Sequence, residues 1–300
     1  MADVATSADA HVGLQRVCRD LGANRSTFTA RAARERARGA AGTASEAGPR
    51  RGRPPTIADD ALLARIKDDL AATPFVGEGH RKVWARLRAQ EVRVSRDRVL
   101  RVMRERALLA PHRAGVARGP RVHDGSITPA RPDAMWGADF TTTTTAEDGQ
   151  VAVFAVIDHC TAEGLGAHAA ARATRHAALE PVRQAVAARF GAFRKDVAAG
   201  RGLALRHDHG SQYLSRDFQA ELGFLGIASS PAFVRAPEGN GCIERFFRTL
   251  KEQLLWVRRF KNVAELDAAL KEWLALYNTR WLIARHGFLS PEAYRKKVSA

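Results

Sequence analysis

The sequence predicts a mixed α/β fold, in which all-α helix-turn-helix segments precede a domain built on a mixed sheet. Three observations lead to this prediction. Apolar residues recur at helical spacing through the first third of the chain. β-branched and apolar runs of strand length begin near residue 135, with a turn signal between the first two. Strand and helix patterns then alternate, which is typical of an α/β sheet.

The first third of the chain carries two groups of helix patterns. Two short helices joined by a glycine turn are expected within residues 13–37, in the form of a helix-turn-helix or of an ordinary helical hairpin. Three helices are expected in the second group, over residues 57–72, 81–90 and 95–108. Ser95 is the expected N-cap of the last of these helices.

The helix expected over residues 95–108 is strongly basic. Arg96, Arg98 and Arg101 lie outside its apolar stripe and are therefore candidates for contact with DNA. A basic helix at the end of a three-helix unit is a candidate recognition helix for the major groove. The alternative is a basic face that is only solvated.

From residue 135 onward the pattern changes to strands alternating with helices. Strands are expected over residues 135–145, 151–157, 164–170, 203–207 and 226–229. Helices are expected over residues 174–199, 215–222, 239–257 and 263–277. Glu147-Asp148-Gly149 is a hairpin turn signal between the first two strands.

Two stretches rich in Gly, Pro and Arg have no apolar periodicity and are predicted to be linkers. The expected organisation is a helix-turn-helix-like segment (1–37), a linker (38–56), a helix-turn-helix DNA-binding domain (57–110), a linker (111–132), an α/β core (133–257) and a helical extension of that core (258–300).

The net charge of +16 over 300 residues indicates a polyanionic partner. Residues 1–130 hold 25 basic and 14 acidic side chains, residues 131–240 hold 11 and 12, and residues 241–300 hold 12 and 6. A nearly neutral middle is therefore flanked by two basic arms. Arg outnumbers Lys by 40 to 8, which suits bidentate phosphate binding but also fits codon bias in a GC-rich genome.

The three cysteines, Cys18, Cys160 and Cys242, are far apart and form no CxxC or zinc-type spacing. They fit a reducing compartment rather than a disulfide scaffold. The N-terminal residues do not resemble a signal peptide, and the longest apolar run is too short to span a bilayer. We therefore expect a soluble cytoplasmic protein without a membrane partner.

Three carboxylates stand at the ends of predicted elements. Asp139 lies in WGADFT on the first strand, Asp208 in RHDHGSQY after a short strand, and Glu244 in the first turns of a helix, with 35 residues between positions 208 and 244. Strand ends are where an α/β sheet places reactive groups. Carboxylates brought together repel one another unless cations neutralise them, and Mg²⁺ prefers oxygen ligands. The alternative for each acid alone is a surface or capping role.

The motifs WGADFT, HDHGSQY and GNGCIERFFRTLK resemble the three catalytic motifs of the retroviral-integrase superfamily. The likeness is above all to the second-reading-frame transposases of bacterial insertion sequences of the insertion-sequence-three type. It continues through Trp273, Tyr277-Asn278 and RHGFLSPEAYR, and upstream through GHRKVWARLRAQEVRVSRDRVLRVMRE. It covers residues 13 to 297.

The resemblance implies a ribonuclease-H-like core that cleaves and joins DNA strands with Mg²⁺ or Mn²⁺, two ions being expected. Asp139, Asp208 and Glu244 would be the catalytic, metal-binding triad. Arg248 and Lys251, which share a helix face with Glu244, would contact the DNA end. Pairing of these two cations with glutamates of the same helix is the alternative.

Some residues depart from the family pattern or lie beside it. Gly239-Asn240-Gly241 stands where the family often has Asp-Asn-Ala, and no zinc module precedes the core. His207 and His209 flank Asp208, and strand alternation points them away from it, so they are expected to be surface or supporting groups, with a role in metal binding as the alternative. Asp158 ends the second strand and is expected to be structural.

The expected function is that of a transposase that frees a 3′-OH at an element end and joins it to another phosphodiester. Its expected partners are double-stranded DNA at element ends and targets, further copies of itself on DNA, and the product of an upstream DNA-binding frame. Two alternatives are a DNA-binding regulator with an inactive core and a nuclease that cuts RNA in hybrids.

Overall fold

The computed structural model describes residues 56–110, 127–232 and 240–299, together with Cys18, Ser26, residues 29–33 and Glu35. The chain divides into two compact units, Met1–Thr56 and Ile57–Ala300. The helical pair predicted over residues 13–37 lies largely outside the described residues, and so do most of the two predicted linkers. The description below concerns the second unit.

The second unit begins with three short helices, α4 (Asp59–Ala72), α5 (His80–Ala89) and α6 (Arg96–Glu105). They surround a small apolar core that includes Leu62, Ile66 and Leu87. The Ser95 hydroxyl accepts a hydrogen bond from the Arg98 backbone N–H at 3.2 Å and caps α6, as predicted.

The sheet has five strands in the order β3-β2-β1-β4-β5. Their bounds are β1 (Met135–Thr145), β2 (Gly149–Asp158), β3 (Gly164–Ala170), β4 (Ala204–His207) and β5 (Ala228–Pro231). The first three strands form an antiparallel meander, whereas β4 and β5 run parallel to β1. This arrangement confirms the predicted ribonuclease-H-like mixed sheet that follows an all-α segment.

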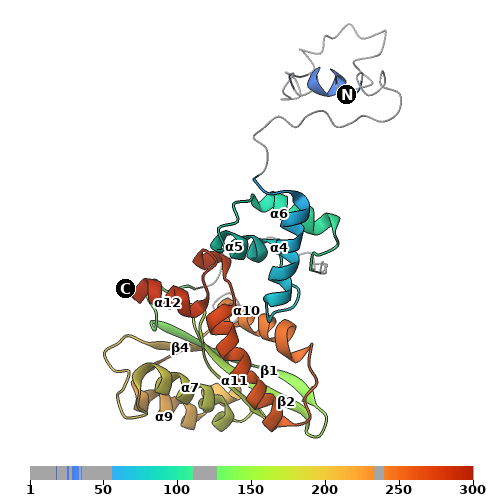
Figure 1. Ribbon diagram of the computed structural model, residues 1–300. Helices are drawn as coiled ribbons and strands as arrows, with labels where there is room; N and C mark the ends of the chain where they lie inside the picture. Colours follow the sequence, from blue (N-terminus) through green and yellow to red (C-terminus); the bar gives the residue numbers. More distant parts are fainter. Residues whose placement is uncertain are drawn as a thin grey trace. The chain divides into compact units, whose positions relative to one another are not determined.

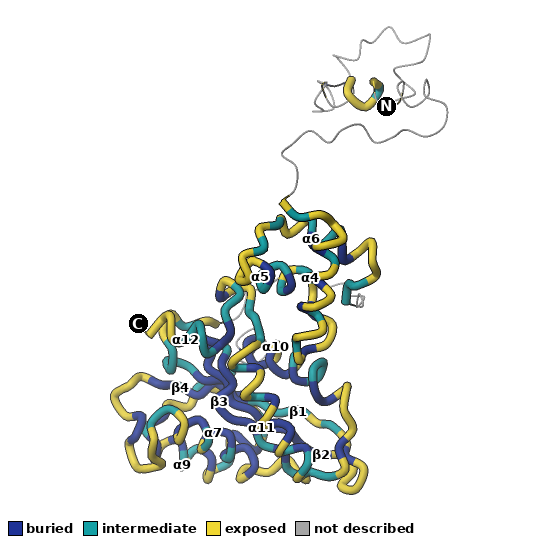
Figure 2. Tube along the Cα trace, viewed as in Figure 1, coloured by how far each residue is buried: buried dark blue, intermediate teal, exposed yellow. Residues whose placement is uncertain are grey.

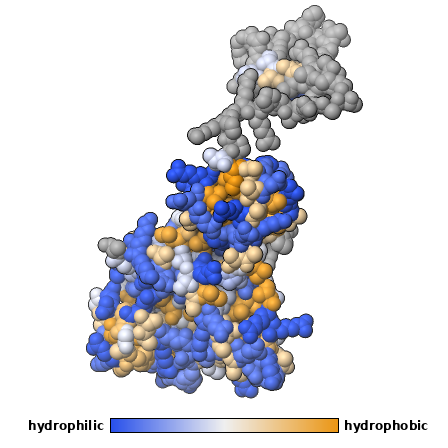
Figure 3. Space-filling model, in the orientation of Figure 1, coloured by the Kyte–Doolittle hydropathy of each residue, from blue (hydrophilic) through white to orange (hydrophobic). Residues whose placement is uncertain are grey.

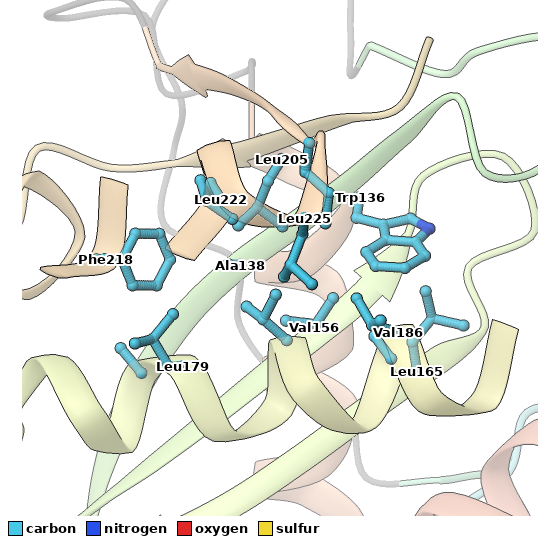
Figure 4. Packing of buried hydrophobic residues seen from close by; sticks show 14 of the residues in the cluster. Trp136, Ala138, Val156, Leu165, Leu179, Val186, Leu205, Phe218, Leu222 and Leu225 are labelled. Carbon is cyan, nitrogen blue, oxygen red and sulfur yellow. The ribbon is translucent and has the colours of Figure 1, made fainter. Parts of the chain in front are cut away.

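Strand alternation gives the sheet two apolar faces. Trp136, Ala138 and Val156 face one core, which α7 (Arg175–Phe190) and α9 (Arg216–Leu225) cover. Figure 4 shows these strand residues facing α7, which contributes Leu179 and Val186, with side chains of α9 completing the cluster.

The opposite face of the sheet is covered by α10 (Gly241–Leu250) and α11 (Val263–Arg280). Ala155 and Ile157 of β2 pack there against Phe246 and Leu270. In Figure 1, α11 crosses over the strands, and in Figure 2 the strands are the most continuously buried part of the core. A sheet enclosed on both faces holds β1, the strand of Asp139, rigidly in place.

Two helices predicted from periodicity differ from those observed. The helix expected over residues 174–199 ends at Phe190, because Gly191 adopts a left-handed conformation and closes it. The helix expected over residues 239–257 is interrupted: α10 ends at Leu250 and continues as a π-helical turn, η2 (Lys251–Leu255). The sequence patterns did not indicate the short α8 (Ser211–Leu214), η3 (Ala284–His286) or α12 (Pro291–Ser299).

The last helix is anchored to the start of the core by an ionic network. The Arg295 guanidinium donates to Asp133 at 2.6 Å and also pairs with Glu163, which Arg189 engages from α7. The Asp158 carboxylate accepts from the Asp133 backbone N–H at 2.7 Å. Asp158 is completely buried and bound within this turn, which supports the structural role expected for it.

The three-helix segment also contacts the core inside this unit. The Gln253 side chain of η2 accepts from the Val76 N–H and donates to the Val76 carbonyl, each at 2.8 Å. Phe75 packs edge-on against Trp281.

No helix in the described ranges is long and apolar enough to cross a membrane, and the face seen in Figure 3 is largely hydrophilic.

Candidate active site

Asp139 is placed by the alternation of β1. Its neighbours Ala138 and Phe140 face the core beneath α7, so the Asp139 side chain points to the other face, toward α10. One carboxylate oxygen accepts from the Phe140 backbone N–H at 2.8 Å. The side chain is half-buried.

Asp208 follows directly after β4. The parallel register pairs Gly137 with Arg206, so two residues further along the strands Asp139 and Asp208 come to neighbouring positions. The Asp208 carboxylate accepts from the Gly210 N–H at 2.8 Å, which closes a tight turn. A Cβ on Gly210 would lie 2.3 Å from Nε2 of Gln212 and 2.9 Å from this carboxylate oxygen, so glycine here leaves room for both side chains.

Glu244 lies in the first turn of α10 and points outward, because Ile243 and Phe247 occupy the buried side of that helix. A cavity of about 390 Å³ opens between β1 and this helix. Its lining comprises Asp139, Phe140, Thr141, Glu244, Phe247, Arg248, Lys251, Glu252 and Trp256. Residues 105 positions apart in the sequence, 139 and 244, therefore face one cavity.

The electrostatics of the cavity are those of crowded carboxylates. Burial, together with the negative charges of Asp208 and Glu244, raises the pKa of Asp139 to about 7, while the Phe140 N–H and the Lys251 ammonium oppose the shift. The carboxyl of Asp139 thus holds a proton near neutral pH unless a cation replaces it.

These residues fit a divalent cation in charge and in donor chemistry. All three donors are carboxylates, which hard ions such as Mg²⁺ prefer. The negative charges of Asp208 and Glu244 help to raise the pKa of Asp139, and a bound cation would relieve this repulsion. In the described ranges no three His, Cys, Asp or Glu side chains are gathered closely enough to hold an ion as they stand.

Arg248 and Lys251 lie on the same wall of the cavity as Glu244. Arg248 is 66% exposed, and its Nε atom donates to the Glu252 carboxylate at 3.0 Å. The pairing within the helix that was considered for this residue is therefore present. The Lys251 ammonium instead acts on Asp139, whose pKa it lowers.

The strand beneath the cavity requires glycine at position 137. A Cβ there would lie 2.4 Å from Nε2 of His159 and 3.3 Å from Oδ1 of Asn240. His159 is completely buried, and its Nδ1 atom lies 3.0 Å from the Ile127 carbonyl. Gly137 thus lets His159 and Asn240, the residue before α10, pack against the strand of Asp139.

The histidines beside Asp208 take up the supporting positions expected of them. His207 is buried, with Nε2 2.9 Å from the Ser229 hydroxyl, and it stacks on Tyr213. Burial lowers the pKa of His207, so the ring is neutral. His209 is exposed.

The basic residues singled out on α6 divide into two groups. The Arg98 guanidinium donates to Asp59 at 2.6 Å and to the Ile57 carbonyl, and the Arg101 guanidinium donates to the other Asp59 oxygen at 2.6 Å. Both therefore tie α6 to the start of α4. Arg96 is exposed, with its nearest acid, Asp97, 3.9 Å away.

Sequence reasoning missed two residues near the carboxylates. Trp256 lines the cavity although it lies twelve positions after Glu244, and no helical periodicity indicates it. Tyr213 is buried, its hydroxyl has no hydrogen-bond partner among the described residues, and the charges of Asp139 and Asp208 add to the burial that raises its pKa. The motif HDHGSQY contains this tyrosine, so the sequence could have indicated it as a residue near the site.

Known proteins match the chain over most of its length. Two models of the integrase core domain match residues 129–237 and 225–282, and a model of an HTH-like domain matches residues 58–115. The transposase for insertion sequence element IS629 of Shigella sonnei is 29% identical over 232 residues, which are 74% of this chain and 75% of that protein.

Further similarities agree in kind. Transposase InsD for insertion element IS2A/D/F/H/I/K of Escherichia coli is 28% identical over 228 residues, 72% of this chain and 74% of that protein. The crystal structure of the catalytic core domain of BIV integrase is 17% identical, with a TM-score of 0.41, and covers 56% of this chain and 96% of that one. The chain contains an integrase core domain and an HTH-like domain and is homologous to these transposases.

Proposed function

We propose that this homologue of the insertion-sequence transposases cuts DNA at the ends of a mobile element and joins each freed 3′-OH to another phosphodiester. As such a homologue, the chain functions in DNA transposition as a polynucleotidyl transferase. One observation carries the finer proposal: Asp139 and Glu244 line one cavity with Arg248 and Lys251, while Asp208 acts on Asp139 from the adjacent strand.

Asp139, Asp208 and Glu244 are the residues proposed to hold Mg²⁺ or Mn²⁺, two ions in all. Ions bound there would activate the attacking oxygen and stabilise the leaving 3′ oxygen. Two of the three carboxylates are held in place by backbone hydrogen bonds in the absence of an ion. The Phe140 N–H fixes one oxygen of Asp139, and the Gly210 N–H fixes one oxygen of Asp208, so each carboxylate is already oriented.

The cations of the cavity wall are proposed to hold the DNA end. Lys251 lies close enough to Asp139 to lower its pKa, so its ammonium would meet a phosphate that approaches the carboxylates. Arg248 would exchange the Glu252 carboxylate for a DNA phosphate, whose two non-bridging oxygens its planar fork fits. Neither side chain needs to move far, since both already line the cavity.

The three-helix segment is proposed to bind double-stranded DNA at the element ends through exposed basic residues such as Arg96. Its HTH-like match supports this role. Two ends must be joined in one reaction, so we expect several copies to assemble on DNA, with or without an upstream-frame DNA-binding protein. The reaction would take place at the bacterial nucleoid, where the element resides.

The test is the variant Glu244→Gln. It keeps the shape of the side chain and removes its charge, so it should bind end DNA nearly as the native protein does but fail in Mg²⁺-dependent cleavage and joining. Glu272→Gln is the matched control, because Glu272 is an exposed glutamate on α11 outside the cavity. Full strand cleavage and joining by Glu244→Gln would refute the proposal.

Substrate comparison separates the alternatives. A nuclease for hybrids would cut an RNA–DNA duplex in preference to element-end DNA. A regulator with an inactive core would bind the ends and cut neither substrate. Cleavage and joining of end DNA, together with little hydrolysis of the hybrid, is the result expected of a transposase.

A further inference from the structure

Trp256 lines the catalytic cavity, and neither the proposed metal ions nor the phosphate assigns it a task. Its side chain is 62% exposed, although Trp is among the residues that gain most from burial. It shares the cavity with Asp139, Glu244, Arg248 and Lys251. A flat apolar surface is therefore presented to solvent beside the proposed site of reaction.

The π-helical turn explains how Trp256 reaches this position. In a regular α-helix, at about 100° per residue, Leu255 would lie about 20° from Glu244 around the axis and Trp256 about 120° away. The Trp256 N–H instead donates to the Lys251 carbonyl, five residues earlier, at 2.9 Å. This inserts one extra residue into the turn.

The extra residue exchanges the roles of two neighbours. Leu255 is only 6% exposed and joins the apolar core beneath the sheet. Trp256 moves onto the face that carries Glu244, Arg248 and Lys251. Single π turns occur often at functional sites, and here the turn brings an indole to the cavity at the cost of regular helix hydrogen bonding.

The cationic side chains around the indole of Trp256 indicate the kind of ligand that it binds. Arg248 and Lys251 suit the phosphates of a strand whose scissile bond reaches the carboxylates. The bases attached to those phosphates lie within reach of the same wall. An aromatic side chain among phosphate-binding cations is the combination that binds single-stranded nucleic acid, because every base has a face on which to stack.

We propose that Trp256 stacks on a nucleobase released from pairing next to the reacting phosphodiester, and so positions the DNA end in the cavity. The inference rests on the proposed function and adds to it a recognition element for unpaired bases. A paired base inside a duplex offers no free face. The indole should therefore favour ends that are frayed or opened, for which the unpairing cost is already met.

The experiment compares Trp256→Ala, Trp256→Phe and Val257→Ala in the full chain. Val257 is the matched control, since it is 57% exposed beside Trp256 but does not line the cavity. The probes are two short labelled duplexes of the same sequence, one with a closed end and one with a few unpaired terminal nucleotides, and affinity is measured by fluorescence anisotropy in EDTA. A 2-aminopurine at the unpaired terminus reports stacking directly, through quenching of its fluorescence.

Trp256→Ala should weaken binding of the open-ended duplex about 5- to 150-fold, the range that loss of one aromatic stack gives. Its effect on the closed duplex should be smaller. Trp256→Phe should retain most of the affinity, Val257→Ala all of it, and quenching of the 2-aminopurine should disappear only in Trp256→Ala.

Equal affinity of the native protein and Trp256→Ala for the open-ended duplex would overturn the inference. Unchanged DNA binding with altered self-association in Trp256→Ala would assign the indole to a second copy of the chain and would overturn it as well. Because these readouts need no catalysis, a native protein that stacks on the probe but cleaves no DNA end would contradict only the proposed function.

Discussion

Replacing Asp139 by Asn should stabilise the metal-free protein at neutral and alkaline pH. The folded carboxyl has a pKa of about 7, against 3.8 for an unperturbed aspartate. As pH rises from 3.8 to 7 the unfolded chain loses this proton and the folded chain keeps it, so Asp139 makes the native state progressively less stable. Asn has no proton to lose, and its amide oxygen can still accept from the Phe140 N–H.

The magnitude follows from the size of the pKa change. A rise from 3.8 to about 7 corresponds to at most about 4 kcal/mol above pH 7, at about 1.4 kcal/mol per pKa unit. At pH 5 part of this penalty is already present in the native protein. The stabilising effect of Asp139→Asn should therefore grow by about 2–3 kcal/mol between pH 5 and pH 8.

Urea unfolding followed by tryptophan fluorescence, in EDTA at several pH values, measures this difference. Asp196→Asn is the control, because Asp196 is exposed and its left-handed backbone suits Asn equally well. Addition of Mg²⁺ at pH 8 should then stabilise the native protein more than Asp139→Asn. A stability difference that is the same at pH 5 and pH 8, or a less stable variant at pH 8, would refute the electrostatic account of the site.

Three further substitutions test other parts of the structure. Gly137→Ala should cost about 1–3 kcal/mol in the free energy of unfolding, because its Cβ would meet Nε2 of His159 at 2.4 Å. Arg98→Ala should lower the stability of the three-helix segment by about 1 kcal/mol, since it removes the hydrogen bonds to Asp59 and the Ile57 carbonyl; thermal unfolding monitored by circular dichroism measures the loss. Arg96→Ala should leave stability unchanged but reduce the slope of log affinity for DNA against log salt by about 1, and an unchanged slope would remove Arg96 from the phosphate contacts.

The strands of the core were predictable because their patterns are local. β1 and β3 begin and end at the predicted residues. In β1 the aromatic and β-branched residues that precede a turn signal determine the bounds. The helix over 174–199 was predicted too long. Apolar periodicity continues past Gly191, and only the left-handed conformation of that glycine shows where the helix closes.

The sequence singles out three carboxylates for the site, but it does not predict the side-chain contacts that the structure shows elsewhere. Their motifs and spacing singled out Asp139, Asp208 and Glu244. Arg98 binds Asp59, which lies 39 residues earlier in the sequence on another helix. No local sequence pattern predicts a contact of this kind. The π turn was equally hidden, because a single extra residue within a helical pattern does not change the spacing of the apolar positions before it.

The ionic network of Arg295, Asp133 and Glu163 has a consequence for the order in which the core folds during synthesis. Arg295 is synthesised 162 residues after Asp133. Asp133, just before β1, therefore has no Arg295 to pair with until most of the core has been synthesised. Domains fold as their residues emerge, and a contact between early and late residues closes last. We therefore expect a nascent chain that has already exposed the three-helix segment, but not yet Arg295, to show whatever DNA binding is proposed for that segment before the α/β core is complete.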